Sequence, residues 1–313
     1  MNFREVLGRQ ILFFDGGMGT LLQERGLKAG EVPETWNIVH PECIRQIHKE
    51  YLMAGSNIIS ANTFGVNAFK CKNLPYTVDE LVTAGIQLVQ EAIQEVRSSS
   101  NGGEKQPMYA ALDIGSIGKL LKPLGEISFD EAYKTFQEII IAGDKAGADL
   151  ILIETVSDSY EIKAAVLAAK ENSNLPVVVT MIFDESGKLL TGGDVASVTA
   201  MLEGLGVDAV GFNCGLGPEQ MKNLLPQLTA CCSLPVVINA NAGLPMVVNG
   251  QTVFHVAPEE FAQSVKTLVE MGAGIVGGCC GTTPAHIQRV VELCKDMEIK
   301  PVTDKNLTVV SSY

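Results

Sequence analysis

Three cysteines stand at positions in the sequence where they could hold a metal ion together. Cys279 and Cys280 are adjacent, follow an apolar run and are flanked by glycines, while Cys214 ends a separate apolar run. Glycines let a turn direct two neighbouring side chains at one target, and adjacent cysteines rarely bridge each other because the disulfide is strained. Three thiolates are soft donors that suit zinc, and a catalytic zinc site keeps a fourth position open. The residues therefore favour a zinc site, with a redox thiol pair as the alternative, which the lack of a CxxC spacing weakens.

The other five cysteines are expected to be structural. A lone cysteine is most often a small buried hydrophobe, which is our interpretation of Cys43, Cys71 and Cys294. Cys231 and Cys232 stand at the end of a predicted helix, away from the strand ends that carry the other thiols. The N-terminus lacks a signal-peptide core, and the longest apolar runs are far shorter than the roughly 20 residues of a membrane span. We therefore expect a cytoplasmic, reducing compartment without a disulfide framework.

The composition predicts a large packed core and argues against nucleic acid and membranes as partners. Hydrophobic residues make up 46% of the 313 residues and charged residues 19%, which is typical of a globular protein. The net charge is −13, and phosphate contacts would need clustered lysines and arginines. No basic amphipathic helix suggests a membrane surface.

Eight apolar runs of strand length alternate with eight stretches of helical length. Such near-continuous apolar strands are buried on both faces, as in a parallel sheet covered by helices. Eight units in order predict an α/β fold of the (β/α)₈ TIM-barrel type in a single domain, with an open doubly wound sheet as the alternative. The predicted strands are residues 11–15, 57–61, 108–113, 150–154, 177–183, 209–213, 236–240 and 274–278. The predicted helices are residues 42–54, 78–97, 129–146, 159–171, 195–205, 218–231, 258–271 and 284–297.

Polar residues gather where these strands end. Asp15 ends the first predicted strand, Glu154 the fourth and Asn213 the sixth, next to Cys214. The remaining polar residues at strand ends are Asn62, Asp113, Asn239 and Asn241. In a barrel all of these meet at the C-terminal rim, where the active sites of such enzymes lie. The three candidate ligands and the polar residues therefore predict one site.

Several short motifs carry a resemblance to a known family. They are Asp15-Gly16-Gly17-Met18-Gly19-Thr20, Pro33-Glu34-Thr35-Trp36-Asn37, Asn62-Thr63-Phe64-Gly65, Glu154-Thr155, Asn213-Cys214-Gly215, Asn241-Ala242-Gly243-Leu244-Pro245 and Gly277-Gly278-Cys279-Cys280-Gly281-Thr282. The chain resembles the homocysteine S-methyltransferase family over about residues 5–298. Within that family it looks most like the N-terminal homocysteine-binding module of the cobalamin-dependent methionine synthase branch. The motifs are specific as a set, whereas any one glycine motif would be weak.

The resemblance implies an organisation and a set of site residues. It implies a homocysteine-binding barrel at residues 1–298 and a C-terminal tail or linker at 299–313. It implies zinc on the three cysteines, with the homocysteine sulfur at the remaining position and Asn241 aligned with a position that can supply a fourth ligand without substrate. Asp15 and Glu154 match carboxylates that hold the substrate ammonium, and Asn213 is a further substrate-site candidate. The backbone at Gly17, Met18, Gly19 and Thr20 matches the turn that binds the substrate carboxylate.

The activity that the resemblance implies is methyl transfer to zinc-bound homocysteine, giving methionine. Zinc deprotonates the bound thiol, so no general base is needed at sulfur and no histidine is assigned to the site. The loop at 26–37 and the double-cysteine motif look like the cobalamin-dependent branch, so the expected donor is methylcobalamin on a cobalamin-binding domain or a separate corrinoid protein. This chain has no segment long enough to bind cobalamin itself, and its tail resembles a linker into a folate-binding barrel of a longer chain. The alternatives are betaine or S-methylmethionine as donor, another thiol or selenol as acceptor, and a non-catalytic module that binds homocysteine or zinc.

Overall fold

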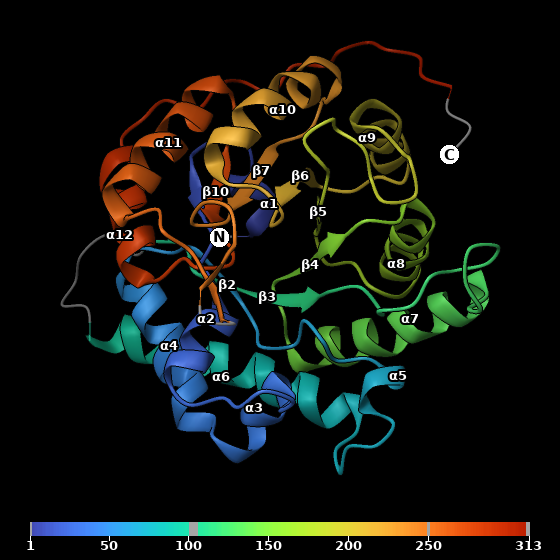
Figure 1. Cartoon of the computed structure of the whole chain (residues 1–313), viewed down its shortest axis with the longest axis vertical. Helices are drawn as coiled ribbons and strands as arrows, with labels where there is room; N and C mark the ends of the chain where they lie inside the picture. Colours follow the sequence, from blue (N-terminus) through green and yellow to red (C-terminus); the bar gives the residue numbers. More distant parts are fainter. Residues whose placement is uncertain (1, 100–105, 249–250, 311–313) are drawn as a thin grey trace.

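Eight parallel strands form the centre of the molecule, and helices surround them (Figure 1). The computed structural model describes residues 2–99, 106–248 and 251–310. The strands of the main sheet are β1 (Leu12–Phe13), β2 (Ile58–Ser60), β3 (Tyr109–Ile114), β4 (Leu150–Val156), β5 (Val177–Met181), β6 (Ala209–Asn213), β7 (Val236–Ala240) and β10 (Ile275–Gly278). They are hydrogen-bonded in the order β1-β10-β7-β6-β5-β4-β3-β2.

The two ends of this strand order also meet each other. Phe14, just after β1, forms a parallel bridge with Ile58 of β2. The backbone N–H of Asn57 donates to the carbonyl oxygen of Phe13 at 2.7 Å. The sheet therefore closes on itself, which confirms the predicted (β/α)₈ barrel over the open sheet.

The helices follow one another around this barrel (Figure 1). The eight that were predicted are α4 (Pro41–Met53), α6 (Val78–Ser99), α7 (Phe129–Ala146), α8 (Ser159–Asn172), α9 (Val195–Gly204), α10 (Pro218–Cys231), α11 (Pro258–Met271) and α12 (Pro284–Cys294). The additional elements are α1 (Phe3–Val6), α2 (Met18–Glu24), the 3₁₀ helix η1 (Pro33–Thr35), α3 (Trp36–Val39), α5 (Ala68–Cys71) and the hairpin of β8 (Met246–Val248) and β9 (Gln251–Val253). Among the described residues, no helix is both long and apolar enough to cross a membrane.

Alternation along the strands places the core and the site. In β4, Leu150 and Leu152 belong to the cluster that fills the barrel, while Ile151 and Ile153 belong to the cluster packed against the helices. Successive side chains of a strand point to opposite faces, so the next inward residue of β4 is Glu154. Four other strands change in the same way, because Ser60 of β2, Asp113 of β3, Thr180 of β5 and Asn239 of β7 each stand two residues after an apolar member of the interior cluster. The barrel is thus filled with hydrocarbon below and lined with polar groups at its C-terminal rim.

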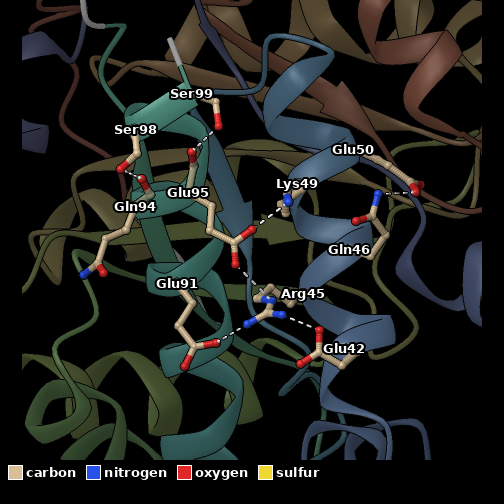
Figure 2. Close-up of polar contacts among 10 residues, drawn as sticks. All are labelled: Glu42, Arg45, Gln46, Lys49, Glu50, Glu91, Gln94, Glu95, Ser98 and Ser99. Carbon is tan, nitrogen blue, oxygen red and sulfur yellow. Dashed lines mark hydrogen bonds and ion pairs between the residues drawn. The ribbon is translucent and has the colours of Figure 1, made fainter.

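Ion pairs connect α4 to α6 on the outside of the barrel (Figure 2). Arg45 of α4 pairs with Glu42 of its own helix and with Glu91 and Glu95 of α6, the last at 3.2 Å. Lys49 also pairs with Glu95, at 2.6 Å. A network in which one arginine joins three carboxylates contributes more than isolated surface pairs do. The network connects α4, which precedes β2 in the chain, to α6, which follows it.

The last helix ends earlier than predicted, at Cys294 rather than at residue 297. Residues 295–310 contain no helix or strand, although the apolar residues at 307–310 have a strand-like sequence. A strand needs a partner edge, and the closed barrel leaves none free. The apolar side chains of the tail consequently remain exposed, 58% at Leu307 and 95% at Val310.

Candidate metal and substrate site

The thiols of Cys214, Cys279 and Cys280 converge at the C-terminal rim. Their sulfur atoms all lie within 4.8 Å of one another, and the Cys214 and Cys280 sulfurs are 3.7 Å apart. Zinc–thiolate bonds of about 2.3 Å in a tetrahedron separate the sulfurs by about 3.8 Å. Within the described ranges this is the one cluster of three or more such side chains that could hold a metal ion. Its donor type and spacing fit zinc.

The end of β7 forms hydrogen bonds with the cysteines that follow the two strands beside it, β6 and β10. The N–H of Cys214 donates to the carbonyl of Asn239 at 3.1 Å, and that of Cys279 to the carbonyl of Ala240 at 2.8 Å. The N–H of Cys280 donates to the side-chain oxygen of Asn241 at 3.1 Å. Consecutive residues of one strand end therefore position all three candidate ligands.

Backbone strain marks the same region. Cys214 and Thr155 have φ angles of +53° and +60°, a region that non-glycine residues rarely adopt. Asn213 connects the two residues, because its side-chain oxygen accepts from the Thr155 N–H at 3.0 Å. Its amide group also donates to the Thr155 hydroxyl at 2.6 Å and to Glu154 at 3.3 Å. Such strain persists where the surroundings fix it and is concentrated at functional sites.

In the absence of a metal the three thiols share their protons unequally. Hydrogen bonds from Cys279 and Cys280 lower the pKa of Cys214 to about 3, and the bonds to Cys214 raise the pKa of both donors. A divalent cation would replace these bonds and hold all three groups as thiolates.

Two glycine-rich turns pack against each other beside the cysteines. The N–H of Gly17 donates to the Thr282 hydroxyl at 3.1 Å, and the N–H of Gly281 donates to the Thr20 hydroxyl at 3.0 Å. A Cβ on Gly17 would lie 2.8 Å from the carbonyl oxygen of Cys279, so this approach requires glycine. The start of α2 is thereby held against the double-cysteine turn.

The thiols form part of the wall of a cavity of about 470 Å³. Its polar lining includes Asp15, Glu34, Ser60, Asn62, Asp113, Glu154, Thr155 and Asn239, and its apolar lining includes Met18, Pro33, Phe64 and Phe254. None of the described lining residues is a lysine, an arginine or a histidine. The cavity is therefore rich in carboxyl groups without a protein cation to balance them.

The carboxyl groups are buried and hard to ionise. Burial raises the pKa of Asp15 to about 7, although the Ser60 N–H and hydroxyl donate to it at 2.9 and 3.0 Å. Burial, followed by repulsion from Asp15, raises the pKa of Glu154 to about 8. Asp113 is 6% exposed, and burial followed by repulsion from Glu154 raises its pKa as well. A cationic ligand would relieve this repulsion.

Comparison with known proteins identifies the family. The sequence model described as homocysteine S-methyltransferase matches residues 12–294. The chain belongs to the homocysteine S-methyltransferase family. The description of the family names methyl transfer to the sulfur of homocysteine.

Relatives and solved structures agree with this family. The chain is 30% identical to a protein named methionine synthase from Mycobacterium leprae and 30% identical to one from Mycobacterium tuberculosis, over 93% and 91% of its own length. It spans about a quarter of the length of these relatives, 25% in each case. The metallated form of the homocysteine methyltransferase MmuM from Escherichia coli has the same fold, with a TM-score of 0.78 at 22% identity over 91% of this chain and 96% of that one.

The structure brings the sequence candidates of this family member together. Those that line the cavity are Asp15, Gly17, Met18, Gly19, Thr20, Glu154, Cys214, Cys279 and Cys280. Asn213 and Asn241 are not among the lining residues but contact them: the Asn213 amide donates to Glu154, and the Asn241 side-chain oxygen accepts from the Cys280 N–H. Of the remaining cysteines, Cys71, Cys232 and Cys294 are buried and all five are free, which fits their structural interpretation.

Sequence reasoning did not select several lining residues as site residues. These are Gln23, Glu34, Ser60, Phe64, Thr252 and Phe254. Glu34 lies within one of the family motifs. Phe254 follows β9, and only the Asn249-Gly250 pair in the sequence, typical of a hairpin turn, could have indicated that element.

Proposed function

We propose that this chain transfers a methyl group to the thiol of homocysteine, giving methionine, with zinc held by Cys214, Cys279 and Cys280. The convergence of three thiols in a carboxyl-lined cavity carries the proposal. When bound, zinc lowers the pKa of the substrate thiol so that it is present as the nucleophilic thiolate at neutral pH. Family membership supports homocysteine as the acceptor.

The cavity offers a complementary group for each end of the substrate. The first-turn N–H groups of α2, at Met18, Gly19 and Thr20, lack acceptors within the helix and suit the substrate carboxylate. Asp15 and Glu154 suit its ammonium group. With both ends held, the side chain can extend toward the thiols.

Asn213 and Asn241 position the groups that would meet substrate and metal. Asn213 restrains Glu154 through the bond from its amide group. The Asn241 oxygen accepts from the Cys280 N–H, and because an amide oxygen has two lone pairs it can keep this bond while it serves as a fourth ligand without substrate.

The methyl group is proposed to come from methylcobalamin carried by another domain or protein. The named methionine synthases extend far beyond the quarter of their length that this chain matches, so there is room in them for a donor-carrying part. A second candidate has support from the cavity itself. Betaine and S-methylmethionine carry a positive charge at the methyl-bearing atom, and the carboxyl groups with Phe64 and Phe254 suit such a cation.

Turnover measurements test the proposal. The zinc-loaded protein is assayed for methionine formation from homocysteine with methylcobalamin, betaine or S-methylmethionine. Cys214→Ser is expected to lose bound zinc and at least about a thousandfold in rate, since the thiolate is not formed without the metal. Cys43→Ser, outside the cavity, is the matched control. A Cys214→Ser protein that folds and keeps both zinc and activity would overturn the zinc assignment, and zinc retention without turnover on any donor would indicate a binding module.

A further inference from the structure

Asp113 occupies the uppermost inward position of β3. Ala111 and Tyr109, two and four residues earlier, belong to the cluster inside the barrel, and the alternation of the strand turns Asp113 the same way. Its register partner on β4 is Leu152, so Glu154 is the next inward residue on that neighbouring strand. Asp113 therefore lies beside Glu154 at the floor of the cavity, which both residues line.

One oxygen of the Asp113 carboxyl group receives no hydrogen bond from any described residue. This Oδ1 atom is buried, and because the residue is only 6% exposed, bulk water does not supply the missing donor. The backbone oxygen of Asp113, in contrast, accepts from the Thr63 hydroxyl at 2.8 Å. A buried polar atom without a partner destabilises the fold, so its persistence in a cavity suggests that a ligand supplies the missing donor.

The other two carboxyl groups at the floor have less free capacity. Asp15 accepts two hydrogen bonds from Ser60, one to each of its oxygens. Glu154 accepts one from Asn213. Of these three carboxyl groups, Asp113 therefore has the most acceptor positions without a hydrogen-bond donor. The described lining of the cavity contains no cationic side chain that could pair with it.

We propose that Asp113 is a third carboxylate that binds the ammonium group of the amino-acid substrate and determines specificity for it. This inference rests on the proposed function. An ammonium group has three N–H donors, and Asp113, Glu154 and Asp15 offer acceptors at the ends of β3, β4 and β1 in the lining of one cavity. The unpaired Oδ1 would then receive a charge-assisted hydrogen bond, the stronger kind. A thiol acid without the amino group would leave that atom unpaired.

Calorimetric binding of two ligands to the zinc-loaded protein tests this assignment. The ligands are homocysteine and 4-mercaptobutanoate, which has the same thiol and carboxylate but no amino group. Asp113→Asn is expected to weaken homocysteine binding by about tenfold or more and to leave 4-mercaptobutanoate binding within about twofold, because only the former loses a charged hydrogen bond. The ratio of the two affinities is a readout that a merely structural residue would not change.

Glu161→Gln is the matched control. Glu161 is a buried carboxyl of α8 that accepts from Ser116 and Ile117 and is not part of the cavity lining, so its replacement is expected to leave the affinity ratio unchanged. Asp113→Glu keeps the charge but displaces it by one methylene and is expected to shift the ratio less than Asp113→Asn does.

The outcomes separate this inference from the proposed function. If the wild-type protein binds homocysteine no better than the des-amino analogue, the proposed substrate orientation fails. If the wild-type protein discriminates but Asp113→Asn loses affinity for both ligands equally, or for neither, the role of Asp113 is overturned. Should Asp113→Asn not fold, Asp113→Ser, which also removes the carboxyl group, is measured instead, and an unchanged affinity ratio in that variant would overturn the role as well.

Discussion

Several groups that are proposed to act in the cavity are held by a polar neighbour from another strand end. Ser60 restrains Asp15, Asn213 restrains Glu154, and Asn241 restrains the backbone at Cys280. Partners of this kind fix ligand geometry and affect metal affinity without touching the metal. The barrel thus supplies both the reactive groups and the groups that orient them.

Replacement of Asn241 by alanine is expected to weaken metal binding. The change removes the acceptor of the Cys280 N–H and the candidate fourth ligand, and loss of such support typically lowers metal affinity by about 10- to 100-fold. Competition for zinc with a chromophoric chelator measures the effect. Asn241→Asp, which keeps an oxygen at the same place, is the control and should bind within about threefold of wild type. Equal affinities for Asn241→Ala and wild type would contradict the supporting role.

The raised carboxyl pKa values predict how the metal-free protein responds to pH. Burial raises the pKa of Glu154 from 4.5 to about 8. For an acid whose pKa is higher in the folded state, stability is fully present below the unfolded value and is lost as pH rises through the folded value. The metal-free protein should therefore lose stability between about pH 5 and pH 8.

Glu154→Gln isolates this contribution. The variant removes the ionisable group, so it is expected to be more stable than wild type at pH 9, by about 4 kcal/mol, and to differ little at pH 5. Urea unfolding of the two metal-free proteins at both pH values measures the difference. A stability difference that is the same at pH 5 and pH 9 would mean that ionisation of Glu154 is not its cause.

At the scale of elements, the double-cysteine turn depends on contact with the segment after β9. Gly281 has a φ of +78°, and a Cβ there would lie 2.3 Å from the Phe254 ring. Gly281→Ala is expected to cost about 1–3 kcal/mol of stability and to displace Cys279 and Cys280, so that bound zinc falls below half of the wild-type amount. Metal analysis after dialysis checks this.

Two further variants show which cause dominates. Gly204→Ala, at the end of α9, has no atom within 4 Å of the added Cβ and should retain full zinc. Combining Gly281→Ala with Phe254→Ala removes the clash but keeps the unfavourable φ. If the double variant binds no more zinc than Gly281→Ala alone, backbone strain rather than Phe254 limits the turn.

The main elements of the barrel were predictable because they repeat one pattern. The predicted strand at 209–213 and the predicted helix at 258–271 coincide with β6 and α11, since buried apolar runs and first-turn prolines define them locally. The short elements were not predictable in this way. The α2 helix has seven residues and follows a glycine N-cap that offers no side-chain hydrogen bond, and β8 and β9 have three residues each, so tertiary contacts decide their structure.

The candidate site was predictable to a similar extent. The three cysteines, Asp15 and Glu154 could be selected because their residue types stand at the ends of predicted strands. The active sites of such barrels lie at the C-terminal rim, so these residues could be assigned to one site. The unpaired oxygen of Asp113 and the approach of Phe254 to Gly281 depend on packing between distant segments. No local pattern in the sequence encodes them.

At the scale of the whole molecule, the proposed metal would join two strands that are not neighbours. Cys214 follows β6, Cys279 and Cys280 follow β10, and β7 lies between these strands in the sheet. A metal held by all three residues would therefore connect β6 to β10 across the end of β7. We call this connection, which spans three consecutive strands of the rim, the three-strand bridge.

Zinc is accordingly expected to stabilise the barrel. A ligand that binds only the folded state contributes about 4 kcal/mol when its free concentration is a thousand times the dissociation constant. For a domain of this size that corresponds to a rise in Tm of about 8–16 °C, using about 2–4 °C per kcal/mol. Calorimetric scans of chelator-treated and zinc-loaded protein measure it. Cys214→Ser, which breaks the bridge at β6, should show almost no zinc-dependent shift, while Cys43→Ser should shift like wild type. If Cys214→Ser shifts as much as wild type, zinc stabilises the chain somewhere other than this rim, and the three-strand bridge is wrong.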